Sequence, residues 1–216
     1  MLKAILTRLL DALRSMRPPR PQQTLENLDE LAVYLDEQAA YIAQSAAYSY
    51  CRARTGFMGP KLFEEPSFLA RLEITKWETY LAVLEDLFLI LESHIRPAEF
   101  AGQERLHATL CVLYDRILTG RPVPDHLEQG WPKAGEGFSL RLAQSQMTAE
   151  KSPATVSQHS GKVLFETVPI HPDLKNLDEE MVINSIRFRF VRFAEDLKKK
   201  LAASPQFVNM ALAEAP

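Results

Sequence analysis

The chain has 216 residues, of which 46% are hydrophobic, so it can close a core without metals or disulfides. Eight glycines against 14 prolines, with many Leu, Ala and Glu residues, indicate helices interrupted by proline rather than sheets. The net charge is −3, but residues 1–22 hold five cations and one anion, which leaves 20 basic and 27 acidic residues in 23–216. This excess of acidic residues in 23–216 argues against nucleic-acid binding, which needs a basic surface.

The first predicted element is an amphipathic helix near the N-terminus. Apolar residues recur at steps of three and four along one face, and cations lie opposite them. The helix stops at the proline-rich segment 17–21, a short stiff spacer. We therefore divide the chain into residues 1–22, the basic helix with its spacer, and residues 23–216, a single helical domain.

Three roles for this first helix follow from its pattern. A basic amphipathic helix can lie on an anionic membrane surface, can serve as an organelle presequence, or can pack on its own body or in a homo-oligomer. The membrane or partner contacts would be made by Leu2, Lys3, Leu6, Arg8, Leu9, Leu13, Arg14 and Arg17.

The next three predicted helices form an up-down-up core. The first of them begins at a cap, Asn27, and ends at Gly56, which can supply a left-handed stop. Residues 67–95 form the second, whose latter half is apolar nearly all round and is therefore placed centrally. After the corner at Pro97, the third runs to Gly120.

The second half of the body is less regular. We expect a long loop or an irregular crossing segment over residues 121–137, because prolines and turn formers surround its tryptophan. A short helix follows over 138–147. A helix opens at Pro153, and a long helix spans about 173–202, followed by a brief terminal helix from Ser204. The predicted fold is all-α, an irregular bundle of about six to seven helices with a separate N-terminal amphipathic helix.

The cysteines and the lengths of the apolar runs indicate the cellular location of the protein. Cys51 and Cys111 lack the close spacing of a zinc or redox site, and two free thiols suit a reducing compartment. No apolar run approaches the ~18 residues that cross a bilayer. We expect a cytoplasmic protein, peripheral to the membrane if the first helix binds lipid.

Three tyrosines repeat every seven residues in the helix that follows Asn27. Tyr34, Tyr41 and Tyr48 place their phenols in a row roughly opposite the leucine stripe. Such a row can line an apolar pocket with polar handles, or it can be a second packing face. These residues are the candidate ligand pocket.

An alternating segment lies inside the last long helix. In helical register, Phe188 emerges near Arg189 and Arg192, where an exposed ring among arginines suits a partner contact. The same residues could instead pack against other parts of the chain. We include them among the membrane or partner contacts.

Metal chemistry has little support in the sequence. The Glu-x-x-His spacing of di-iron bundles occurs once, at Glu104 and His107, with Glu92 and His94 ending the preceding helix. These four are weak candidate ligands. We predict no metal and no cofactor.

Two further motifs are set aside as coincidental. Arg121 and His126 have the Arg-x4-His spacing that resembles the motif of HEPN-type helical RNases, but that motif belongs on a helix, and Pro122 and Pro124 lie between them. Residues 157–162 contain Gly-Lys but lack the spaced glycines of a phosphate-binding loop.

No catalytic constellation remains, so we expect a non-enzymatic helical interaction or accessory protein with a protein partner, possible recruitment to a membrane surface, and no nucleic acid. The alternative is a helical carrier or sensor for an apolar small molecule in the tyrosine-lined pocket.

Overall fold

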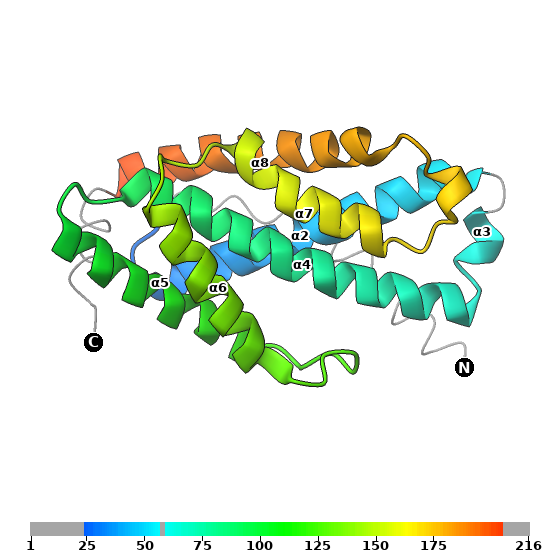
Figure 1. Ribbon diagram of the computed structural model, residues 1–216, viewed down its shortest axis with the longest axis horizontal. Helices are drawn as coiled ribbons and strands as arrows, with labels where there is room; N and C mark the ends of the chain where they lie inside the picture. Colours follow the sequence, from blue (N-terminus) through cyan, green and yellow to red (C-terminus); the bar gives the residue numbers. More distant parts are fainter. Residues whose placement is uncertain (1–23, 57–58, 205–216) are drawn as a thin grey trace.

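The computed structural model describes residues 24–56 and 59–204, which form six long α-helices and no β-strand (Figure 1). The predicted all-α bundle is confirmed for this part of the chain. The first predicted helix, the boundary at residue 22 and the predicted helix after Ser204 lie outside the described residues. The long helices are α2 (Leu28–Thr55), α4 (Pro66–Ile95), α5 (Phe100–Thr119), α6 (Gly130–Gln146), α7 (Pro153–Thr167) and α8 (Glu179–Ala203).

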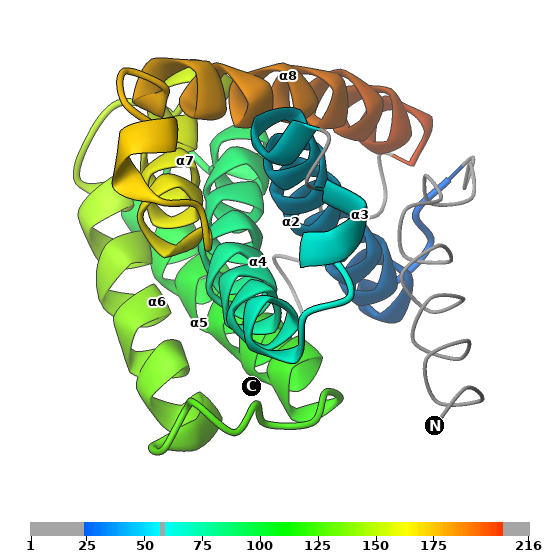
Figure 2. The ribbon, with the colours of Figure 1, turned by 90° about the vertical axis from the view of Figure 1, so that its right-hand side faces the viewer.

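Helix α4 lies in the middle of the bundle, as its apolar second half predicts (Figure 2). Helices α2 and α7 pack along it, α8 lies over both α7 and α2, and α5 pairs with α6. Side chains from all six long helices join one hydrophobic core, in which Phe88 of α4 and Phe190 of α8 are fully buried. None of these helices combines the length and apolar composition that crossing a membrane requires.

Helix α2 has the ends that its sequence predicts. The side chain of Asn27 accepts a hydrogen bond from the N–H of Glu30 at 2.9 Å, and Glu30 in turn accepts one from the N–H of Glu26 at 2.9 Å. Gly56, with φ of 47°, follows the last turn in a conformation that favours glycine. A four-residue helix, α3 (Gly59–Leu62), lies in the connection to α4.

The start of α6 corrects the sequence prediction. The helix begins at Gly130 rather than at residue 138, so part of the expected loop is helical. Tertiary packing overrides the weak local propensity: Trp131 is buried against Trp77, with ring centroids 6.0 Å apart, and its Nε1 donates to a backbone carbonyl at 3.1 Å. Pro132 sits in the first turn, where its missing N–H costs nothing.

Helix α8 also begins later than predicted. A 3-10 helix, η2 (Pro172–Leu174), precedes it, and Leu177 adopts φ of 63°, which interrupts helical geometry before Glu179. Asp178 fixes this corner from a buried position, because its carboxylate accepts a hydrogen bond from Tyr50 at 2.8 Å and pairs with Arg54. The junction between α8 and the end of α2 is therefore set by contacts distant in sequence.

Candidate functional site

Two surface depressions bring polar and apolar side chains together. One, the α2–α8 groove, has a volume of about 670 Å³ and lies between α2 and α8. The other, the α4–α6–α7 cleft, has a volume of about 500 Å³. The candidate contacts in residues 1–22 lie outside the described residues and stay a prediction. They are Leu2, Lys3, Leu6, Arg8, Leu9, Leu13, Arg14 and Arg17.

The α2–α8 groove is lined by residues of two predicted sites, the candidate ligand pocket on α2 and the candidate partner contacts on α8. Tyr34 and Tyr41 come from α2, and Phe188, Arg189 and Arg192 come from α8. Phe188 is 70% exposed, so most of its surface is free of contact with the described chain. The groove thus combines an exposed aromatic ring with two guanidinium groups and with the carboxylates of Glu195 and Asp196.

The three tyrosines Tyr34, Tyr41 and Tyr48 do not line one pocket. Tyr34 is buried, stacks on Phe193 with centroids 5.6 Å apart, and donates a hydrogen bond to Asp196 at 2.8 Å. Burial and the neighbouring carboxylate raise the pKa of Tyr34. Tyr48 lies away from the groove and stacks on Phe63 at 5.8 Å. Seven residues are not two whole helical turns, so the row rotates by about 20° at each step.

The two arginines of the groove differ in their surroundings. Arg189 donates to the backbone and hydroxyl of Ser185, both at 2.7 Å, and to Ser45 of α2 at 3.2 Å. Burial lowers the pKa of its guanidinium, and Arg192 adds to that shift. Arg192 is exposed, and within the described part of the chain no carboxylate lies within 4.0 Å of it.

Three of the four weak metal candidates have other hydrogen-bond partners. Glu92 is fully buried and pairs with both Nε and a terminal nitrogen of Arg96 at 2.7 Å. His94 contacts a backbone carbonyl of its own helix at 2.8 Å, whereas His107 contacts side chains of α6. Glu104 is exposed. Over residues 24–56 and 59–204, no three His, Cys, Asp or Glu side chains could share a metal ion.

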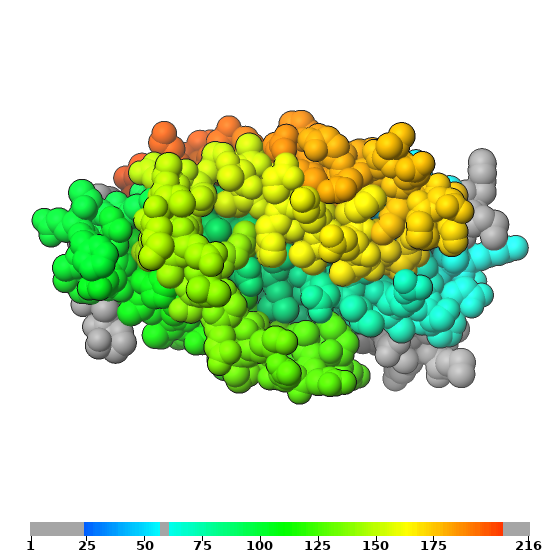
Figure 3. Space-filling model, in the orientation of Figure 1, coloured from blue at the N-terminus to red at the C-terminus, as the bar shows by residue number. Residues whose placement is uncertain are grey.

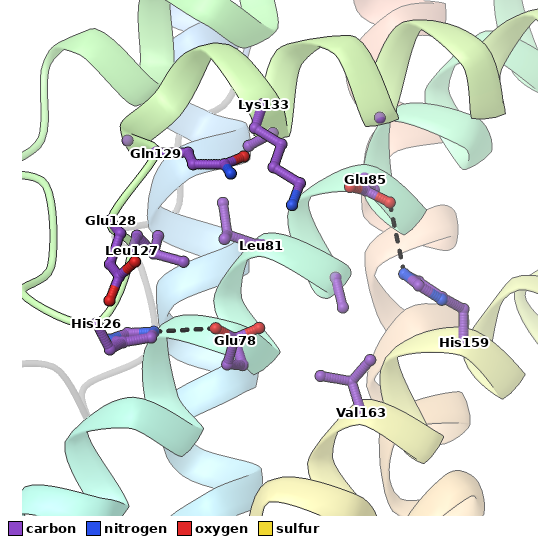
Figure 4. A pocket seen from close by; sticks show the side chains of 14 residues that line it. Glu78, Leu81, Glu85, His126, Leu127, Glu128, Gln129, Lys133, His159 and Val163 are labelled. Atoms are coloured by element: carbon purple, nitrogen blue, oxygen red, sulfur yellow. Dashed lines mark hydrogen bonds and ion pairs between the residues drawn. The ribbon is translucent and has the colours of Figure 1, made fainter.

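The α4–α6–α7 cleft was missed by sequence reasoning. Side chains of α4 are visible at the bottom of a depression between α6 and α7 in the space-filling view (Figure 3). Leu81 and Ala82 of α4 and Val163 of α7 form an apolar floor. Polar side chains surround this floor, as the close view shows (Figure 4).

Two carboxylate–imidazole pairs line the cleft at opposite ends (Figure 4). Nε2 of His126 donates to Glu78 at 2.9 Å, and Nε2 of His159 lies 3.4 Å from Glu85. Glu78 and Glu85 are seven residues apart on α4, so they share a face and are separated by about 10 Å along the axis. His126 lies in the connection between α5 and α6, and His159 lies on α7.

A buried ion pair holds the walls of the cleft together. Asp86 of α4 is fully buried, pairs with Arg141 of α6, and accepts a hydrogen bond from the N–H of Ser160 of α7 at 3.2 Å. Arg141 also donates to Glu85 at 2.9 Å. Burial raises the pKa of Asp86, and Arg141 opposes that shift. One buried carboxylate therefore connects all three helices.

The early start of α6 completes the cleft. Lys133 and Gly137 are four residues apart. Because the helix already begins at Gly130, they lie on one helical face, which lines the cleft wall. The prediction of a loop or an irregular crossing segment over residues 121–137 missed this wall. The available signal was the spacing on α4, where Glu78, Leu81, Ala82 and Glu85 follow the steps of one helical face.

The described residues form an all-α bundle. Comparison with protein-family models, with curated proteins and with solved structures finds no match for the sequence or the fold.

Proposed function

We propose that the protein is a non-enzymatic helical interaction protein and that the α2–α8 groove binds a partner protein. The observation that carries this proposal is the ring of Phe188, 70% exposed on the same groove as the guanidinium of Arg192. Aromatic and arginine side chains are enriched where binding energy concentrates in interfaces.

The chemistry of the surface supports one kind of partner. Exposed apolar side chains extend along α8 and its preceding turn: Leu177 is 93% exposed, Met181 48% and Val191 40%. Residues 181 and 188 lie seven apart and therefore on one helical face. A segment with apolar side chains and a carboxylate placed to pair with Arg192 fits this surface.

The segment that the sequence predicts to be an N-terminal helix supplies a second part of the proposal. We propose that residues 1–22 attach the protein to an anionic membrane surface, since each cation near such a surface contributes about 1 kcal/mol. A cytoplasmic location is supported by Cys51 and Cys111, which are both free thiols. Deleting residues 1–22 should abolish flotation with phosphatidylserine vesicles, and unchanged flotation would refute this attachment.

The groove is tested by crosslinking from two exposed phenylalanines. A photoreactive phenylalanine analogue at position 188 should capture a partner protein in cells that make the chain. The same analogue at Phe100 of α5, which is 73% exposed, is the matched control. Arg192→Glu should reduce capture from position 188 at least tenfold, the effect of about 1.4 kcal/mol. Equal capture from both positions, or capture unaffected by Arg192→Glu, would contradict the proposal.

The alternative function uses the same groove. Tyr34 and Tyr41 line it, which supports a carrier or sensor for an apolar small molecule. Under this alternative, an apolar fluorescent probe should bind to the protein, and Tyr41→Ala should abolish the binding. Tyr48→Ala should leave the binding unchanged, because Tyr48 lies outside the groove. Probe binding that ignores both substitutions would rule the carrier out.

A further inference from the structure

The carboxylates of the α4–α6–α7 cleft have unused hydrogen-bonding capacity. Oε1 of Glu78 accepts from His126, and Oε2 of Glu85 accepts from Arg141. For the described residues, the second oxygen of each glutamate has no hydrogen-bond partner within the protein. The α4 wall therefore presents two oriented anionic acceptors toward the cleft.

The facing wall carries the opposite charge. Lys133 extends from α6 toward the space between Leu81 and Glu85 (Figure 4). None of the carboxylates described here lies within 4.0 Å of its ammonium group. The first turn of α6 lies at the same edge, and helix N-termini favour negative charge. Glu128, exposed in the preceding connection, is the one acidic group among the lining residues that lies off α4.

The floor between the two walls is apolar. Leu81, Ala82 and Val163 offer hydrocarbon surface, which a purely ionic ligand would leave uncovered. The volume of about 500 Å³ is in the range of small-molecule sites, roughly 300–1,000 Å³. A complementary ligand thus needs a cation, an anion and an apolar body.

We propose that the α4–α6–α7 cleft binds a small zwitterion, an amino acid or short peptide with an apolar side chain. Its ammonium group lies against Glu78, because Glu85 lies at the opposite end of the cleft (Figure 4) and already pairs with Arg141. Its carboxylate lies against Lys133 and the first turn of α6. Its side chain covers Leu81 and Val163. His126 acts as a positioning residue, because its hydrogen bond fixes the orientation of the Glu78 carboxylate.

Matched ligands test each charge of the zwitterion. The full chain is titrated by calorimetry with L-leucine and the dipeptide Leu-Leu, with isoamylamine, which lacks the carboxylate, and with isocaproate, which lacks the ammonium group. At least one zwitterion should bind saturably, and each single-charge analogue should bind roughly tenfold more weakly. No saturation by either zwitterion up to about 10 mM, or equal binding of isoamylamine, would overturn the proposal.

Substitutions in the cleft establish where the ligand lies. A Cβ added at Gly137 meets no atom within 4 Å, so Gly137→Leu should fill the cleft without disturbing the fold, and Gly137→Ala is its matched control. The leucine variant should lose binding and the alanine variant should keep it. Lys133→Met should remove the preference for leucine over isoamylamine. Wild-type binding by Gly137→Leu, with an unchanged helical spectrum, would overturn the assignment to this cleft.

Discussion

Replacing Arg141 with methionine would leave the carboxylate of Asp86 buried without its cation. Asp86 is fully buried, whereas 23% of the Arg141 side chain is exposed. Removing one partner of a buried pair costs about 3–5 kcal/mol, and the exposed edge of Arg141 favours the lower end, about 3 kcal/mol. Methionine retains most of the apolar packing, so the loss measured by urea unfolding reports mainly the charge.

The pH dependence of this loss has a definite sign. Arg141 is the largest of the groups that lower the pKa of Asp86, so its removal raises that pKa further. A carboxyl group whose pKa is higher in the folded than in the unfolded state destabilises the fold above that pKa, and the deficit shrinks as the group protonates. The difference in unfolding free energy between wild type and variant should therefore decrease as pH falls from about 7 to 5.

A double variant separates charge from packing. Asp86→Asn combined with Arg141→Met removes both charges, so it should be less destabilised than Arg141→Met alone. A cost below about 1 kcal/mol for Arg141→Met, with no dependence on pH, would be the behaviour of an exposed pair and would refute the reasoning.

Three other changes test the packing by unfolding or by reactivity. Phe190→Ala empties a fully buried site and should cost about 3–5 kcal/mol in urea unfolding, whereas Phe188→Ala should change stability by less than about 0.5 kcal/mol. Gly161→Ala should lower the free energy of unfolding by about 1–3 kcal/mol, because its Cβ would lie 2.8 Å from the backbone of α8. Gly137→Ala should not lower it, and thermal unfolding compares the two variants. Burial raises the pKa of Cys51 to about 12. In a Cys111→Ser variant, the Cys51 thiol of the folded protein should therefore resist a disulfide reagent near pH 8. Rapid reaction would contradict its burial.

Local signals predicted the helices well where they were strong. Asn27 and Gly56 marked both ends of α2, and the apolar surface of α4 predicted its central position. The prediction failed at residues 130–137, where glycines and Pro132 weaken the helical pattern. There, the helix is held by contacts distant in sequence, because Trp131 packs against Trp77 of α4.

The sequence by itself determined the all-α class, most helix boundaries and the nomination of Tyr34, Tyr41 and Phe188, because apolar periodicity and capping act within a few residues. Tertiary structure alone decided that these three residues line one groove. It alone also joined Glu78, His126 and Lys133 to His159 around one cleft. Such contacts depend on how helices far apart in the chain pack, and no local periodicity encodes that arrangement.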